Sequence, residues 1–205
     1  MRKITDIVQG KRDPNSVNLY IDGEYYSNIP MDFVVEYSLF KGKELSEDDI
    51  KLLDHGRIRS KAYRFMLESL SRKLSSIKDM RDKLAEKGYP YSVIDEVVAK
   101  GEEYGYLDDE EYAKAYVEFN SNKKGVMRIK QELSARGISG DIIEDLEFDD
   151  DSERENALKE ARKFSKGLDL NEPKDKNKLI RHMLYKGYKW DIINYSIDNI
   201  ENIEE

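Results

Sequence analysis

Apolar and polar positions follow the same order in three segments of the chain. Each segment has apolar residues eight and four positions before a glycine, a basic residue directly before it, and two apolar residues five and six positions after it. The glycines, Gly88, Gly137 and Gly187, are 49 and 50 residues apart. A matched pattern of this period is typical of helical repeats in which neighbouring units share a core.

Each repeat is predicted to contain three helices, two that flank the glycine and one that precedes them. In the first repeat we expect them at residues 62–74, 76–88 and 91–103. Ser76 suits the N-terminal cap of the middle helix. Gly88 suits its C-terminal end, because glycine readily adopts the left-handed backbone conformation found there.

Polar residues predict where the second and third repeats begin. Asp108, with Glu111 three positions later, suits a helix cap, and the third repeat opens near Glu153. We interpret the acids at residues 149–151 as a solvated linker. The predicted boundaries of the repeats are residues 57–104, 105–148 and 149–205.

The first thirty residues instead show short β-type runs. These runs lie at residues 4–8, at residues 17–21 and around Tyr25, and polar turns at residues 10–15 and at Asp22-Gly23 separate them. Asp-Gly between two such runs is a strong hairpin signal. A small antiparallel sheet follows, and so few strands need a helix to pack on.

Two helices are expected to link this sheet to the repeats. An apolar stripe at residues 33–40 ends near Gly42, and Ser46 caps the next helix with Asp49 in an approximate capping box. The N-terminal β-hairpin region is therefore residues 1–30, and the linking helices are residues 31–56. The predicted fold is mainly α, with tandem three-helix repeats forming an elongated array and a small N-terminal β-hairpin or sheet.

Composition supports a helix-rich chain without disulfides. Charged residues make up 38% of the 205 residues, against 12 glycines and 4 prolines. The absence of cysteine excludes disulfides and thiolate metal sites, and it agrees with a reducing compartment. We see no signal-peptide pattern and no long uncharged apolar run, so we expect a cytoplasmic protein without a membrane span.

The sign of the charge alternates in step with the repeats. The net charge of −8 argues against a chain that wraps free DNA with its whole surface. Residues 57–91, 123–140 and 157–190 are nevertheless basic, and the segment after each is acidic. The glycine-ended helix is thus always basic and the helix after it acidic, whereas the opening helix is acidic only in the second repeat.

Two interpretations of the basic blocks stay open. They could form recurrent contact patches for a partner of mixed protein and DNA character, or they could pair with neighbouring acidic helices and keep the surface soluble. The candidate partner- or DNA-binding residues are Arg57, Arg59, Lys61, Arg64, Arg72, Lys73, Lys123, Lys124, Arg128 and Lys130.

Other residues give no active site, so we expect no enzyme, no metal and no cofactor. Four acids at residues 108–111 are more typical of capping and dipole compensation than of a metal or acid–base cluster. His55 and His182 lack metal-ligand spacing. We interpret Trp190 as a packing residue in preference to a base-stacking platform. Tyrosines at apolar-face or post-glycine positions are expected in the core: Tyr63, Tyr89, Tyr112, Tyr116 and Tyr188.

The second repeat carries residues that point to a known family. GYLDDEEYA at residues 105–113 is followed by KGVMRIKQEL at residues 124–133 and RGI at residues 136–138. This combination, with residues 70–89 of the first repeat, resembles the RecX family. The third repeat and the N-terminal hairpin resemble those of longer, Gram-positive-type members, so the resemblance covers nearly the whole chain.

The resemblance implies a regulator of homologous recombination and DNA repair rather than a catalyst. RecX proteins bind the RecA recombinase, typically in the helical groove of the RecA–DNA filament. There they modulate ATP hydrolysis, strand exchange and the co-protease activity that triggers the SOS response. The expected partners are RecA and its DNA filament, with weak binding to single- or double-stranded DNA, and we expect a monomer.

The alternative is a helix-turn-helix-like DNA-binding module that acts without RecA. Such a module would bind duplex DNA in a salt-sensitive way, and the acidic net charge counts against it.

Overall fold

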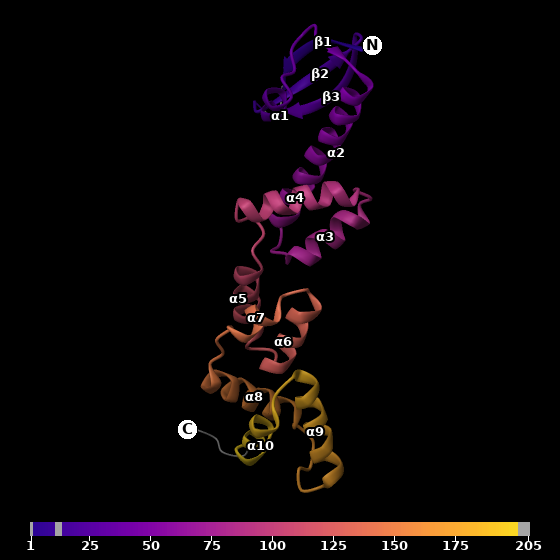
Figure 1. Ribbon diagram of the computed structural model, residues 1–205. Helices are drawn as coiled ribbons and strands as arrows, with labels where there is room; N and C mark the ends of the chain where they lie inside the picture. Colours follow the sequence, from indigo (N-terminus) through magenta and orange to yellow (C-terminus); the bar gives the residue numbers. More distant parts are fainter. Residues whose placement is uncertain (1, 11–13, 201–205) are drawn as a thin grey trace. The chain divides into compact units, whose positions relative to one another are not determined.

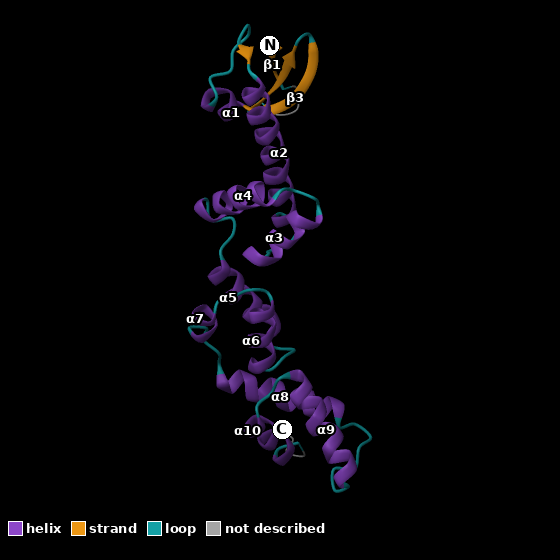
Figure 2. Ribbon diagram, turned by 45° about the vertical axis from the view of Figure 1, so that its right-hand side comes forward, coloured by secondary structure: helices purple, strands orange, loops and turns teal. Residues whose placement is uncertain are grey.

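The computed structural model describes residues 2–10 and 14–200, which form two compact units (Figure 1). The first unit comprises the described residues up to Ser75 together with Met80–Leu107. The second comprises Ser76–Asp79 and the described residues from Asp108 onward. All of the described strands, orange in Figure 2, belong to the first unit. None of the described helices combines the length and apolar character needed to cross a membrane.

The first unit begins with a four-stranded antiparallel sheet in the order β3-β2-β1-β4. Its strands are β1 (Arg2–Gln9), β2 (Ser16–Ile21), β3 (Glu24–Pro30) and β4 (Glu44–Leu45). The predicted small sheet is therefore confirmed, but β4 was not predicted, because two residues are too short to show an alternating pattern.

The tight turn between β2 and β3 is the predicted Asp-Gly hairpin. Asp22 and Gly23 both have positive φ, 54° and 88°, as a turn matched to the twist of the flanking strands requires. The other predicted turn, at residues 10–15, includes residues 11–13, which lie outside the described residues.

Two helices cover one face of the sheet, α1 (Met31–Glu36) and α2 (Glu47–Leu70). Ser46 and Asp49 form the predicted capping box at the start of α2. The prediction of a separate helix beginning at residue 62 is wrong, since α2 continues without interruption for 24 residues. Gly56 lies inside α2, where a helix would normally disfavour glycine. An ideal Cβ at this position would be 2.0 Å from the Phe33 ring, so only glycine lets α1 approach α2 this closely.

The remaining helices of the first repeat are α3 (Ile77–Glu86) and α4 (Tyr91–Glu103), and α4 has the predicted bounds. The Ser76 hydroxyl accepts the Asp79 N–H at 3.1 Å, as expected of a cap. Gly88 has a φ of +81°, which confirms the left-handed end of this helix.

The second unit holds two three-helix groups, each around its own apolar cluster. The first is α5 (Asp109–Asn120), α6 (Val126–Ala135) and α7 (Gly140–Glu144). The second is α8 (Asp150–Phe164), α9 (Pro173–Lys186) and α10 (Trp190–Asp198). The mainly α fold with three-helix repeats is therefore confirmed.

Two local predictions in this unit are wrong. Residues 149–151 are not a linker, because Asp149 accepts the Asp151 N–H and caps α8. Trp190 is not a core residue, since it opens α10 and is 55% exposed.

Among the five tyrosines expected in the core, Tyr112 and Tyr188 are buried, whereas Tyr63, Tyr89 and Tyr116 are half-buried.

The glycine-ended helices meet head to tail. We call the cap and first turn of such a helix its head, and its last residues with the glycine its tail. The Ser76 hydroxyl, at the head of α3, donates to the Arg136 carbonyl at the tail of α6, 2.8 Å away. The Gly125 N–H, at the head of α6, donates to the Lys186 carbonyl at the tail of α9, 3.0 Å away. Ser76 and Gly125 hold the same place in the repeat, so one junction occurs twice.

Adding a methyl group at the α6–α9 junction tests its tightness. An ideal Cβ at Gly125 would lie 2.4 Å from the Gly187 carbonyl oxygen, a backbone atom that cannot rotate away. We expect Gly125→Ala to lower the free energy of unfolding by about 2–3 kcal/mol, measured by urea denaturation. Gly140→Ala is the matched control, because nothing lies within 4 Å of its ideal Cβ and alanine favours a helix. Equal stability of both variants and the parent chain would show that the junction is loose.

Candidate partner-binding surface

The ten predicted contact residues occupy four kinds of environment, and the first kind is internal pairing. Arg59 of α2 bridges Glu36 at 3.2 Å and Glu96 at 3.3 Å, and it lies over the Phe33 ring. Arg57 pairs with Asp54 at 3.0 Å. Burial would lower the pKa of Arg59, but Glu36, Tyr37 and Glu96 together outweigh burial and raise that pKa above its ordinary value. Arg59 therefore links α2 to α1 and α4, whereas the Arg57 pair lies within α2.

The second environment is open solvent. Lys61 and Arg64 lie on the exposed side of α2, and Arg72 and Lys73 follow its C-terminal end. No residue in the described ranges 2–10 and 14–200 forms an ion pair with these four side chains. They are the cations of the predicted set whose charge is least neutralised within the first unit.

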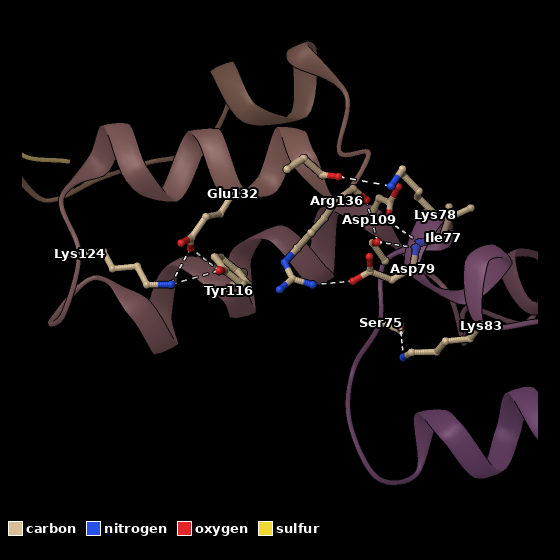
Figure 3. Close-up of polar contacts among 12 residues, drawn as sticks. Ser75, Ile77, Lys78, Asp79, Lys83, Asp109, Tyr116, Lys124, Glu132 and Arg136 are labelled. Carbon is tan, nitrogen blue, oxygen red and sulfur yellow. Dashed lines mark hydrogen bonds and ion pairs between the residues drawn. The ribbon is translucent and has the colours of Figure 1, made fainter. Parts of the chain in front are cut away.

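The third environment is a shared carboxylate in the second unit. Glu132 of α6 pairs with Lys124 at 2.6 Å and with Arg128 at 2.9 Å, and the Tyr116 hydroxyl also donates to it. Figure 3 shows Lys124 and Tyr116 directed at this carboxylate. Two of the predicted cations are therefore partly neutralised by one acid inside their own basic block.

Lys123 and Lys130 complete the predicted set, and both lie over aromatic rings. The Lys123 ammonium is 4.3 Å from the centroid of the Phe119 ring, and Lys130 is 5.5 Å from that of Phe148. Lys123 and Phe119 are both exposed, whereas Lys130 and Phe148 are half-buried. Lys123 thus keeps its charge at the surface, at the start of the α5–α6 connection.

The pairing of Glu132 fixes its protonation. Burial would raise its pKa, but the hydrogen bonds from Lys124, Tyr116 and Arg128 outweigh burial and lower the pKa to about 2. The carboxylate is therefore charged at any ordinary pH.

A second cluster of polar contacts joins the head of α3 to the tail of α6. Arg136 pairs with Asp79 at 2.6 Å, and the Lys78 ammonium donates to the Ala135 carbonyl at 3.4 Å. The Asp109 carboxylate accepts the Ile77 N–H at 2.9 Å, so it caps α3 (Figure 3). Capping was the predicted role of the acid run, but the helix capped by Asp109 lies in another repeat. Burial raises the pKa of Asp109.

The histidines are engaged separately. His55 lies 2.8 Å from Glu96, and His182 lies 2.7 Å from Glu160 and stacks on Phe164. Among the described residues, no group of three or more histidines and acids is arranged to hold a metal ion.

Neutralising Glu132 tests the shared-carboxylate cluster. We expect Glu132→Gln to lower the free energy of unfolding at pH 7 by about 1–2 kcal/mol, because two cations lose their counter-charge. The folded-state pKa of Glu132, about 2, lies below the ordinary pKa of a glutamate, 4.5. The contribution of Glu132 to stability is therefore complete above pH 4.5 and is lost as the pH falls toward 2. The difference between variant and parent should shrink over that window in acid-dependent denaturation curves. Glu118→Gln, at an exposed position of α5, is the control. A difference that does not change with pH would contradict the assignment.

Models of one protein family match most of the chain, in four consecutive parts. A model of the regulatory protein RecX N-terminal domain matches residues 2–46. Models of the first, second and third three-helix domains of RecX match residues 62–100, 108–146 and 151–197.

Curated relatives and solved structures agree with these models. Regulatory protein RecX of Bacillus velezensis is 34% identical over 203 residues, which are 97% of this chain and 77% of the relative. Regulatory protein RecX of Clostridium botulinum is 32% identical, over 100% of this chain and 99% of the relative. A crystal structure of regulatory protein RecX superposes with a TM-score of 0.82 at 28% identity, over 97% of this chain and 100% of that one. A crystal structure of RecX from Lactobacillus salivarius superposes with a TM-score of 0.63 at 30% identity, over 71% of this chain and 98% of that one. The chain therefore belongs to the RecX family of regulatory proteins.

Proposed function

We propose that this chain binds RecA and RecA–DNA filaments in the cytoplasm as a monomer that lies in the filament groove. There it modulates, in the inhibitory direction, ATP hydrolysis, strand exchange and SOS co-protease activity. The observation that carries the proposal is the match of all four parts of the RecX family along the chain.

Exposed cations supply the proposed contact surface. Lys61, Arg64, Arg72 and Lys73 form no ion pair with any described residue, so they lose none when they meet a carboxylate or a phosphate. Arg57 and Arg59 would first have to leave Asp54, Glu36 and Glu96. Breaking such pairs costs free energy that binding must recover, so the exposed four are the better contacts.

The proposed mechanism is a shift between filament states. A regulator that binds one state of the filament more tightly moves the population toward that state by its difference in affinity. A tenfold difference corresponds to about 1.4 kcal/mol, which a few well-placed charge pairs supply. No catalytic group of the regulator is needed for this effect.

Removing the exposed cations tests the surface. We expect the combined variant Lys61→Ala, Arg64→Ala, Arg72→Ala and Lys73→Ala to bind RecA filaments on single-stranded DNA roughly tenfold more weakly, because each charge adds to attraction in the groove. It should also lose inhibition of ATP hydrolysis in proportion. Co-sedimentation and an ATPase assay measure both effects.

The control removes the same charge elsewhere. Lys41, Lys51, Lys114 and Lys159 are exposed and form surface ion pairs, so their combined change to alanine should leave filament binding nearly unchanged. If both variants bind equally well, the proposed surface is wrong. Labelled duplex DNA that binds in a salt-sensitive way without RecA would favour the helix-turn-helix alternative instead.

A further inference from the structure

The tail of α3 lacks the cover that the tails of α6 and α9 have. In each tail the residue before the glycine presents a carbonyl oxygen. That of Arg136 accepts the Ser76 hydroxyl, and that of Lys186 accepts the Gly125 N–H. No donor within residues 2–10 and 14–200 is hydrogen-bonded to the equivalent carbonyl, that of Lys87.

The space around the three glycines differs in the same way. An ideal Cβ at Gly137 would lie 2.7 Å from the Lys78 side chain, and one at Gly187 would lie 2.3 Å from Arg128. Nothing lies within 4 Å of an ideal Cβ at Gly88.

The residue after the glycine is buried in the tails of α6 and α9 but not in the tail of α3. Ile138 is 4% exposed and Tyr188 is 2% exposed, whereas Tyr89 is half-buried. Tyr91, two residues farther along, is 78% exposed. The tail of α3 is therefore an open surface of the first unit.

The heads of α2 and α9 in a second copy are both engaged within their own chain. At α2 the cap and acid are Ser46 and Asp49, and the Asp49 carboxylate already accepts the Ser46 hydroxyl at 2.6 Å and the Ser46 N–H at 2.8 Å. The head of α9 begins with Pro173, which has no N–H to donate. Asp175, which corresponds to Ser76 and Gly125, lies inside the first turn. Its carboxylate already accepts the Asp169 N–H at 3.2 Å and pairs with Lys178 at 2.7 Å. Because both heads are engaged, another protein is the better source of the occupant.

We propose that the tail of α3 binds the N-terminal turn of a helix of the partner protein, which under the proposed function is RecA. The occupant carries serine or glycine at its cap and an acid three residues later. The first requirement follows from Ser76 and Gly125, whose donor groups reach a tail carbonyl at close range. The second follows from the α3–α6 junction alone, where Arg136 pairs with Asp79 at 2.6 Å and where Lys87 is the equivalent of Arg136. At the α6–α9 junction the residue three positions after the cap is Arg128.

The physics of helix ends supports this pairing. The last carbonyls of a helix lack partners and carry partial negative charge, whereas the first N–H groups of another helix lack acceptors and carry partial positive charge. Joining the two ends satisfies both sets, and the acid on the partner meets the Lys87 ammonium.

Site-directed photo-crosslinking tests the assignment in the full chain. Because the chain has no cysteine, Lys87→Cys carries a single thiol that accepts a benzophenone maleimide before mixing. After irradiation with RecA filaments on single-stranded DNA, we expect mass spectrometry to find adducts in the first turn of a RecA helix with a serine or glycine cap and an acid at the third position. Lys159→Cys, at a 64% exposed side chain of α8, is the matched control and should give no such adduct.

Blocking the same thiol gives a second measurement. A polyethylene glycol maleimide on Lys87→Cys should weaken co-sedimentation with the filaments about tenfold, whereas the same group on Lys159→Cys should not. Circular dichroism verifies that both variants fold. Undiminished binding after blocking at residue 87, or adducts in RecA loops, overturns the tail assignment and leaves the proposed function standing. An unaltered chain that does not bind the filaments overturns both.

Discussion

Every helix ends with polar backbone groups that have no partner within the helix, and this constraint shapes the junctions between repeats. In the second unit the donors at the start of one helix bond to the carbonyl oxygens at the end of another. Ser76 and Gly125 donate to the carbonyls of Arg136 and Lys186, so groups left over at a head meet groups left over at a tail. The junction needs a left-handed glycine in the tail and a small residue at the head, because the two backbones nearly touch.

This constraint also explains how the array ends. Repeat proteins need terminal units that differ from internal ones, since nothing further stacks on them. In the third repeat the head of α9 is closed by Pro173 and by the hydrogen bonds of Asp175. In the first repeat the tail of α3 has no such closure among the described residues, although its sequence matches that of the covered tails. The tail of α3 has the sequence of a tail that binds a helix head, but no described head is bound to it, which is why we propose it as the site for a partner.

The sequence predicted those features that depend on local rules. Positive φ at Gly88, Gly137 and Gly187 follows from the residue type, and so does the turn at Asp22-Gly23. The continuity of α2 through Gly56 could not be predicted, because the reason for that glycine is the Phe33 ring, which lies 23 residues earlier. The internal pairing of Arg59 with Glu36 and Glu96 was missed for the same reason, since charge counts along the chain do not show which acids meet which bases in space.

The positive charge of the basic blocks is neutralised by a different element in each repeat. The same position, five residues before the glycine, holds Lys83, Glu132 and His182 in turn. In the second repeat Glu132 neutralises its own block, and in the third the opening helix supplies Glu160 to His182 and Lys186.

In the first repeat the helix after the glycine supplies the acids, since Asp95 of α4 pairs with Arg81 and Glu96 of α4 pairs with Arg59. Lys83 meets the Ser75 hydroxyl, Lys87 lies over the Phe65 ring, and the part of α2 from Arg57 onward has four bases and one acid. Because an ammonium beside an uncharged group keeps its full charge, Lys83 and Lys87 still attract an acidic or phosphate-bearing partner. The exposed cations Lys61, Arg64, Arg72 and Lys73 lie in the same unit as the open tail of α3, so under the proposed function the contacts that attract the partner and those that orient it belong to one repeat.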